Sequence, residues 1–340
     1  MPPTLPIIAV TTGDPAGIGP EIVAHLFSSY TPEASIALVI GAAAALDPWA
    51  ESFGLDCPVA KDIDGLARLT GESPCVVRLD SGVEDRVPVA ADSAAGGRHA
   101  GRAIELACEL ANNGPVGAIV TAPISKKSLN LADFEFLCHT EMLARKLNAP
   151  KCQMMMVHKE LRVVPLTRHL PLREVADAIT ADAIATCVTE TVRGLQSTFG
   201  VRSPRVAVAG LNPHAGDDGV IGTEDRDVIA PALNGLRAHG IDIDGPVPAD
   251  AMFQSVLADI ESSGRPRYDT YITMYHDQGL VPFKMLAQRR GVNVTIGLPV
   301  VRTSVDHGAA YDIAGKGIAE TGSLLEAYEL AEGLIGSTKD

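Results

Sequence analysis

Three histidines in the sequence, His169, His214 and His276, each follow an apolar, β-branched run. Such runs are typical of buried strands, and ligand sites in α/β proteins form outside the carboxyl ends of parallel strands. Imidazole is also a common ligand of zinc and similar divalent metals. Three such strand ends could converge on one open metal site. Position alone nevertheless favours unrelated histidines on separate loops, because the intervals are long and contain no His-x3-His pair.

The composition is that of an ordinary globular enzyme. The 340 residues are 46% hydrophobic and 21% charged, with a formal net charge of −14. This charge argues against nonspecific binding of nucleic acid, which needs a basic face. It does not exclude a small anionic substrate, since the local charge of a cleft can oppose the net charge. We expect no nucleic-acid partner.

The six cysteines are scattered and form no C-x-x-C pair, which favours free thiols in a reducing compartment. The amino terminus has neither a basic segment nor a long apolar core, so no signal peptide is expected. No apolar run approaches the roughly 20 residues that cross a bilayer. These features predict a cytoplasmic protein with no membrane partner.

Short apolar runs alternate with helical patterns almost throughout, which predicts an α/β architecture with parallel strands. One helix is expected after Thr180 as its N-cap, with Ile184, Cys187, Val188, Val192 and Leu195 on one face. A second is expected at about 101–111, and 81–97 is expected to be a surface excursion. The clearest strands are Pro6–Thr11, Ile36–Ile40, Val116–Thr121, Leu161–Leu166, Arg205–Ala209, Thr270–Met274 and Val292–Ile296.

A Gly-rich turn, residues 12–21, directly follows the first predicted strand. Such a turn can direct the N–H groups of a helix N-terminus at an anion. However, it lacks both the G-x-G-x-x-G order and the Gly-Lys-Ser/Thr ending of phosphate loops, and Pro15 and Pro20 remove two N–H donors. An anion cradle and a tight strand-to-helix turn both remain open.

Several polar residues could bind a substrate anion. His139 could hydrogen-bond a substrate oxygen, and Thr140 suits a helix N-cap. Lys284, Asn293 and Arg302 together would make a clamp for a phosphate or carboxylate group. The alternatives are a plain helix cap and solvated surface residues. Small residues within 306–317 would permit close approach of a flat ligand to the backbone, or form an ordinary loop.

These segments, in this order, resemble the 4-hydroxythreonine-4-phosphate dehydrogenase family of pyridoxal phosphate biosynthesis. The resemblance runs over nearly the whole chain, and its most specific motifs are Asn212-Pro-His-Ala-Gly and Tyr275-His-Asp-Gln-Gly. It implies a two-lobed α/β/α fold of the isocitrate and isopropylmalate dehydrogenase type, with a cleft between the lobes. We expect the first lobe at 1–125 plus 290–340, and the second, with the metal site and dimer contacts, at 126–289.

The resemblance also implies an activity: oxidation of 4-phosphohydroxy-L-threonine, dependent on NAD and a divalent metal, with decarboxylation to 3-amino-2-oxopropyl phosphate. Zn²⁺ is the first choice of metal, with Mg²⁺ and Co²⁺ as alternatives, and NADP is the alternative nucleotide. The enzyme would be a homodimer whose metal site draws on both subunits. The implied metal ligands are His169, His214 and His276. The implied substrate-binding residues are His139, Thr140, Lys284, Asn293 and Arg302. The implied nucleotide-binding residues are His307, Gly308, Asp312 and Gly315.

The general base is left open among Lys284, Asp277 and Asp250. One position departs from the family pattern, since Cys138 stands where Gly is usual. Relatives within the family act on threonate or erythronate 4-phosphate or on dihydrodiol dicarboxylates, so the motifs do not fix the substrate. An acyl-phosphate transferase and a non-catalytic paralogue are the remaining alternatives.

Overall fold

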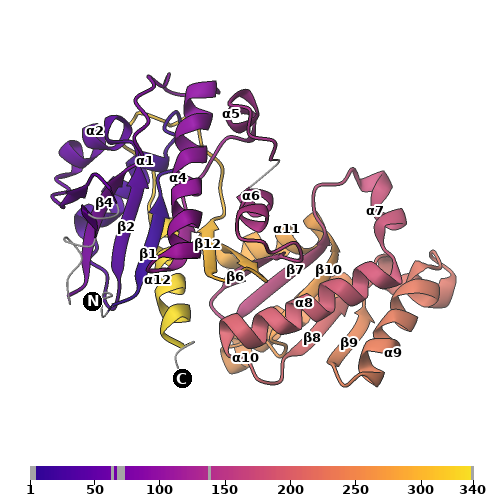
Figure 1. Cartoon of the computed structure of the whole chain (residues 1–340). Helices are drawn as coiled ribbons and strands as arrows, with labels where there is room; N and C mark the ends of the chain where they lie inside the picture. The colour runs from indigo at the N-terminus through magenta and orange to yellow at the C-terminus, as the bar shows by residue number, and fades with distance from the viewer. Residues whose placement is uncertain (1–4, 63–64, 67–72, 137–138, 338–340) are drawn as a thin grey trace. The chain divides into compact units, whose positions relative to one another are not determined.

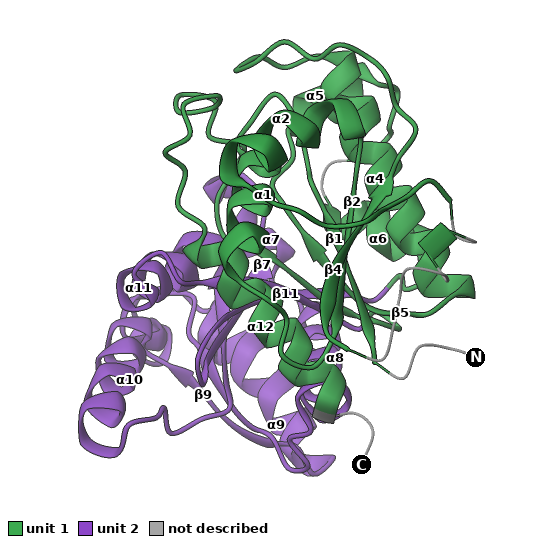
Figure 2. Ribbon diagram, turned by 90° about the vertical axis from the view of Figure 1, so that its left-hand side faces the viewer, with its two compact units in different colours: residues 1–150, 298–340 green, residues 151–297 purple. Residues whose placement is uncertain are grey.

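The computed structural model describes residues 5–62, 65–66, 73–136 and 139–337, and the chain forms two compact units. Unit 1 comprises Met1–Pro150 and Leu298–Asp340, and unit 2 comprises Lys151–Gly297 (Figure 2). The amino- and carboxyl-terminal parts of the chain thus belong to one unit. The sequence analysis places its boundaries elsewhere, at 125/126 and 289/290, and that division stays a prediction.

Unit 1 is built on a parallel sheet with the strand order β3-β4-β2-β1-β5-β12. Thr11 at the end of β1 pairs with Ile40 of β2 and with Thr121 of β5, so three carboxyl ends lie level. The strands are β1 (Ile7–Thr11), β2 (Ile36–Gly41), β3 (Val59–Ala60), β4 (Cys75–Asp80), β5 (Val116–Thr121) and β12 (Val301–Val305).

Helices cover both faces of this sheet (Figure 2). Helix α4 packs on β1, β2 and β5 and contacts α5 and α6, while α12 packs on β5 and β12 and contacts α1. The helices are α1 (Gly19–Ser29), α2 (Ala43–Phe53), α4 (Ala94–Asn113), α5 (Lys126–Leu131), α6 (His139–Lys146) and α12 (Gly322–Ser337). Apolar side chains of α4 and α6 fill the core against β1, β2 and β5.

Unit 2 is built on a mixed sheet with the order β11-β6-β7-β10-β8-β9. β6 runs antiparallel to both of its neighbours, whereas β7, β10, β8 and β9 are parallel to one another. The strands are β6 (Gln153–His158), β7 (Leu161–Thr167), β8 (Arg205–Ala209), β9 (Asp242–Val247), β10 (Thr270–Tyr275) and β11 (Val292–Ile296).

Helices α8 and α9 lie on one face of this sheet, and α10 and α11 lie on the other (Figures 1 and 2). The helices are α7 (Leu172–Ala178), α8 (Ala181–Phe199), α9 (Ala230–Ala238), α10 (Ala249–Ser263) and α11 (His276–Ala287), with the short elements η1 (Pro213–Gly219) and η2 (Asp225–Ile229). Among the helices of the described residues, none combines the length and apolar composition that crossing a bilayer requires.

All seven predicted strands are confirmed, with ends that differ by at most one residue. Among the described residues, five strands were not predicted, namely β3, β4, β6, β9 and β12. β6 contains three consecutive methionines, β9 contains Gly-Pro, and β12 carries Arg-Thr-Ser, none of which is a strand pattern.

The helix expected at 101–111 begins at Ala94, where the Ser93 hydroxyl accepts a hydrogen bond from Gly96 N. The end of the expected surface excursion is therefore helical.

The predicted N-cap at Thr180 is confirmed, since its Oγ1 accepts a hydrogen bond of 3.2 Å from Ala183 N. Because this bond satisfies an otherwise unpaired N–H at the start of α8, Thr180→Ala should lower the free energy of unfolding by about 1 kcal/mol. Urea titration followed by circular dichroism measures this. Thr186→Ala, on the exposed face of the same helix, is the matched control and should leave stability unchanged or slightly raised. Equal loss in both variants would contradict the prediction.

Candidate active site

The three histidines of the expected metal site follow the ends of three adjacent strands in unit 2. β7 leads to His169, β10 to His276 and β8 to His214, and the strand order is β7-β10-β8. All three strands are parallel, so their carboxyl ends lie at the same edge of the sheet. The expectation that these histidines follow the carboxyl ends of parallel strands is confirmed.

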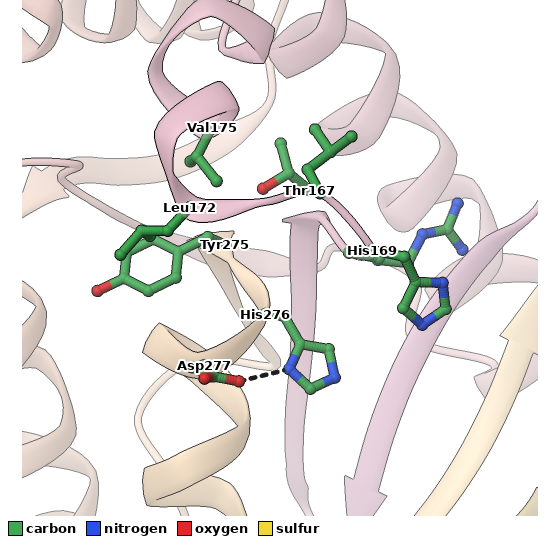
Figure 3. Close-up of a pocket in the computed structure, with 9 residues that line it drawn as sticks. Thr167, His169, Leu172, Val175, Tyr275, His276 and Asp277 are labelled. Carbon is green, nitrogen blue, oxygen red and sulfur yellow. Dashed lines mark hydrogen bonds and ion pairs between the residues drawn. The ribbon is translucent and has the colours of Figure 1, made fainter.

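His169 and His276 lie close together at this edge. Their ring centroids are 6.3 Å apart with the ring planes tilted by 40°. Both rings line a pocket of about 310 Å³, with Leu172, Val175 and Tyr275 among its other lining residues (Figure 3). This separation leaves room for one ion bound through a nitrogen of each ring, and the donors suit zinc.

The carboxylate of Asp277 orients the ring of His276. His276 Nδ1 lies 2.7 Å from Asp277 Oδ1 and donates to it (Figure 3). In a neutral ring that makes this bond, the lone pair lies on Nε2, the atom that would bind a metal. A carboxylate on the second ring nitrogen is typical of metal-binding histidines, where it fixes the tautomer and the ring orientation.

His214 does not join this pair in the single chain. Within the part of the chain that the structure describes, no three His, Cys, Asp or Glu side chains lie close enough to hold one metal. His214 lies on η1, an exposed turn that follows β8. Its place in a shared metal site therefore stays a prediction.

The turn that carries His214 has an unusual backbone. Five consecutive residues, His214 to Asp218, are left-handed, with φ between 44° and 80°. Only Gly216 among them adopts this region without a steric penalty, and each of the other four costs roughly 1–2 kcal/mol. Backbone strain of this kind persists only where surrounding contacts hold it, and it is concentrated at functional sites.

In unit 1, His139 and Arg302 are brought together. Arg302 on β12 is only 1% exposed, and its Nη2 donates to Thr121 Oγ1 at 2.7 Å. His139 is the first residue of α6, and its Nε2 is buried with no hydrogen-bond partner among the described residues. Burial, together with the nearby Arg302 guanidinium, holds the pKa of His139 well below its ordinary value. A neutral imidazole beside a buried guanidinium fits the binding of an anionic ligand.

The other predicted substrate and base residues lie on several different helices and strands. Thr140 is the second residue of α6, so the expected N-cap is wrong at this position. Lys284 is exposed on α11, Asn293 is half-buried on β11, and Asp250 is exposed in the first turn of α10. The clamp of Lys284, Asn293 and Arg302 stays a prediction. Cys138 lies outside the described residues.

The Gly-rich turn of residues 12–21 forms hydrogen bonds with the predicted nucleotide loop. Ile18 N donates to Ala309 O at 3.0 Å, and the Tyr311 hydroxyl donates to the buried Asp14 carboxylate at 2.9 Å. A Cβ on Gly17 would lie 2.4 Å from Ala309 O, so only glycine permits this approach. The sequence analysis did not single out Asp14 or Tyr311, because the contact joins positions 297 residues apart.

The predicted nucleotide-binding residues are exposed on this loop: His307, Gly308, Asp312 and Gly315. A Cβ on Gly308 would meet nothing within 4 Å, so the backbone here faces open space. Such a surface lets the face of a planar ring approach the main chain closely. Nucleotide binding at this loop stays a prediction.

Comparison with known proteins identifies the family of this chain. The family model for pyridoxal phosphate biosynthetic protein PdxA matches residues 37–331. The chain belongs to this family. The resemblance inferred from the sequence motifs is thereby confirmed, and the family accounts for most of the chain.

Relatives within the family carry two different names. A 4-hydroxythreonine-4-phosphate dehydrogenase of Chromobacterium violaceum is 42% identical, with 98% of each chain covered. A protein of Bradyrhizobium diazoefficiens named "Putative D-threonate 4-phosphate dehydrogenase" is 38% identical, with 96% of each chain covered. The crystal structure of the 4-hydroxythreonine-4-phosphate dehydrogenase of Klebsiella pneumoniae superimposes with a TM-score of 0.84 at 35% identity, covering 98% of this chain and 99% of that one.

The depressed pKa of His139 predicts a pH dependence of stability. The folded ring stays neutral, whereas in the unfolded chain it takes up a proton near pH 6.5. Below that pH the unfolded state binds the extra proton, so the free energy of unfolding falls as the pH falls. His139→Gln should flatten this fall between pH 7 and 5, as measured by urea titration.

Nuclear magnetic resonance provides a direct check on the same group. The ring nitrogen signals of His139 should remain those of a neutral imidazole from pH 7.5 to 5.5. A ring that titrates near pH 6.5 would contradict the assignment.

Proposed function

We propose that this chain is an NAD- and metal-dependent dehydrogenase that acts on 4-phosphohydroxy-L-threonine. Oxidation of the substrate hydroxyl gives a β-keto acid, and loss of CO₂ from it gives 3-amino-2-oxopropyl phosphate. The observation that carries the proposal is the pair His169 and His276, with Asp277 orienting the second ring, at the ends of parallel strands. Family membership supports the substrate class.

The metal would be held by His169, His214 and His276, with ligands drawn from two copies of the chain. Two imidazoles lie together in one chain, and an open catalytic zinc site needs three protein ligands. A homodimer that shares its sites would supply the third. When bound, the metal lowers the pKa of the substrate hydroxyl and polarises the new ketone. Zn²⁺ fits the nitrogen donors best, and Mg²⁺ and Co²⁺ are the alternatives.

The substrate phosphate would bind at Arg302 and His139, with Lys284, Asn293 and Thr140 completing the contacts. A guanidinium binds phosphate through two parallel hydrogen bonds, and Thr121 holds the Arg302 side chain in place. Since His139 stays neutral, its buried Nε2 would accept or donate one hydrogen bond without adding charge. These contacts hold the reacting carbon in a fixed position.

The nucleotide would lie on the loop that contains His307, Gly308, Asp312 and Gly315. When bound, NAD⁺ accepts the hydride from the substrate. The exposed Asp312 carboxylate suits a ribose 2′-hydroxyl and would repel a 2′-phosphate, which favours NAD over NADP.

The proton of the substrate hydroxyl needs an acceptor within the same site. Asp277 already accepts a bond from His276, so its first task would be to orient that ring. Lys284 and Asp250 are the remaining candidates for the base.

The scattered thiols and the family's biosynthetic role favour a cytoplasmic enzyme.

D-Threonate 4-phosphate is the second candidate substrate, which the Bradyrhizobium relative favours. The two substrates differ at C2, which carries an ammonium group in one and a hydroxyl in the other. The choice therefore rests on the groups that surround C2 and not on the phosphate clamp. A site that hydrogen-bonds one group rejects the other strongly, because its own polar atoms are left unpaired.

NADH formation at 340 nm tests the proposal, with purified protein, Zn²⁺ and each of the two phosphates in separate reactions. We expect reduction of NAD⁺ with 4-phosphohydroxy-L-threonine, loss of the signal with a chelator, and recovery when Zn²⁺ is restored. A higher kcat/KM for D-threonate 4-phosphate would support the second candidate. No reduction with either compound would contradict both.

Arg302 provides a sharper test of the phosphate clamp. Arg302→Lys keeps the positive charge but loses the forked donors, so KM for the phosphorylated substrate should rise at least about tenfold. The KM for NAD⁺ should change little. A half-buried arginine of unit 1 that pairs with Glu105, changed in Arg102→Lys, is the matched control. An unchanged substrate KM in Arg302→Lys would remove this residue from the clamp.

A further inference from the structure

The buried carboxylate of Asp225 lies beneath the turn that carries His214. Asp225 is 1% exposed and begins η2. Its Oδ1 accepts a hydrogen bond of 2.8 Å from Leu211 N, and its Oδ2 accepts bonds of 3.0 Å from both Asn212 N and Asn212 Nδ2. Three donors from two consecutive residues thus converge on one side chain, just ahead of His214.

The packing around this carboxylate is tight. A Cβ on Gly210, the residue after β8, would lie 2.7 Å from Asp225 Oδ1 and 2.9 Å from Ala215 Cβ. Glu224 adds a bond of 2.8 Å from Asn212 Nδ2 to its Oε2. Because the backbone from His214 onward is left-handed, the turn needs such external contacts to persist. The Asp225 carboxylate supplies the most buried of them.

A second side chain ties this turn to the strand that leads to His276. Gln278 Nε2 donates to Gly210 O at 2.7 Å, and Gln278 Oε1 accepts from Met274 N at 2.7 Å. The ends of β8 and β10 are therefore bridged by one amide. Through this bridge, a shift of Gly210 would also reach the start of α11.

We propose that Asp225 is a positioning residue that sets the place of the His214 imidazole for metal binding. The inference rests on the proposed function, in which His214 is a metal ligand. An ionised carboxylate is the side chain that accepts three N–H bonds at once, and bonds to a charged acceptor are short and strong. In Asp225→Asn an amide NH₂ would face backbone N–H donors, so at least one hydrogen bond is lost. The turn that carries His214 would then be held less firmly in place.

The probe is Zn²⁺ itself, measured by competition with a chromogenic chelator on metal-stripped full-length protein. The variants are Asp225→Asn, His214→Ala and the double variant. Asp227→Asn is the matched control, since Asp227 is exposed, pairs with Arg226 and lies two residues away. Circular dichroism and urea titration confirm that each variant is folded.

We expect Asp225→Asn to weaken zinc affinity about 10–100-fold, as changes behind a metal ligand commonly do. Asp227→Asn should match the wild type. The double variant should bind no more weakly than His214→Ala alone, because Asp225 would act through His214. In turnover, kcat should fall while KM for NAD⁺ stays unchanged.

Four outcomes would overturn the inference. Wild-type zinc affinity in Asp225→Asn would do so, and so would losses that multiply in the double variant. Unchanged affinity in His214→Ala would instead remove His214 from the metal site, and the inference would fall with the proposed function. If Asp225→Asn does not fold, Asn212→Ala removes one donor to the same carboxylate, and wild-type affinity there would equally overturn the inference.

Discussion

The parallel alignment of β7, β10 and β8 is the constraint on which the candidate site depends. Tyr275 at the end of β10 pairs with Thr167 at the end of β7, so the chain leaves both strands at the same level. His276 is then the first residue of α11. The amino-terminal end of a helix carries partial positive charge, which disfavours a cation beside it. The carboxylate of Asp277, in the same first turn, offsets this charge.

Both units use buried carboxylates to organise loops at strand ends. In unit 1, Asp14 accepts a bond from Ala16 N, and Glu21 accepts one from Ala319 N. In unit 2, Asp225 accepts bonds from Leu211 and Asn212. Backbone N–H groups in loops have no ladder partner, so a carboxylate acceptor can satisfy them and stabilise an irregular path. These acids shape the loops on which the proposed ligands would rest.

The central strands and the histidines were predictable because their residues are local signals: β-branched runs and motifs of fixed spacing. Arg302 was named from the sequence as a candidate anion-binding residue, but its strand was not predicted, since an arginine followed by threonine and serine resembles a loop. Asp225 and Tyr311 escaped prediction because their partners lie 14 and 297 residues away along the chain. The left-handed turn at His214 was equally hidden, since only one of its five residues is glycine.

Unit 1 is discontinuous in sequence, and this has a consequence for synthesis on the ribosome. Its first segment emerges before unit 2, while β12 and α12 emerge only after unit 2. Until then, one edge of β5 lacks its strand partner and the sheet face beneath α12 lacks its helix. Open strand edges and uncovered apolar faces invite association with other chains. Unit 1 of the nascent protein would thus stay open to such association for longer than unit 2, whose 147 residues form one continuous segment.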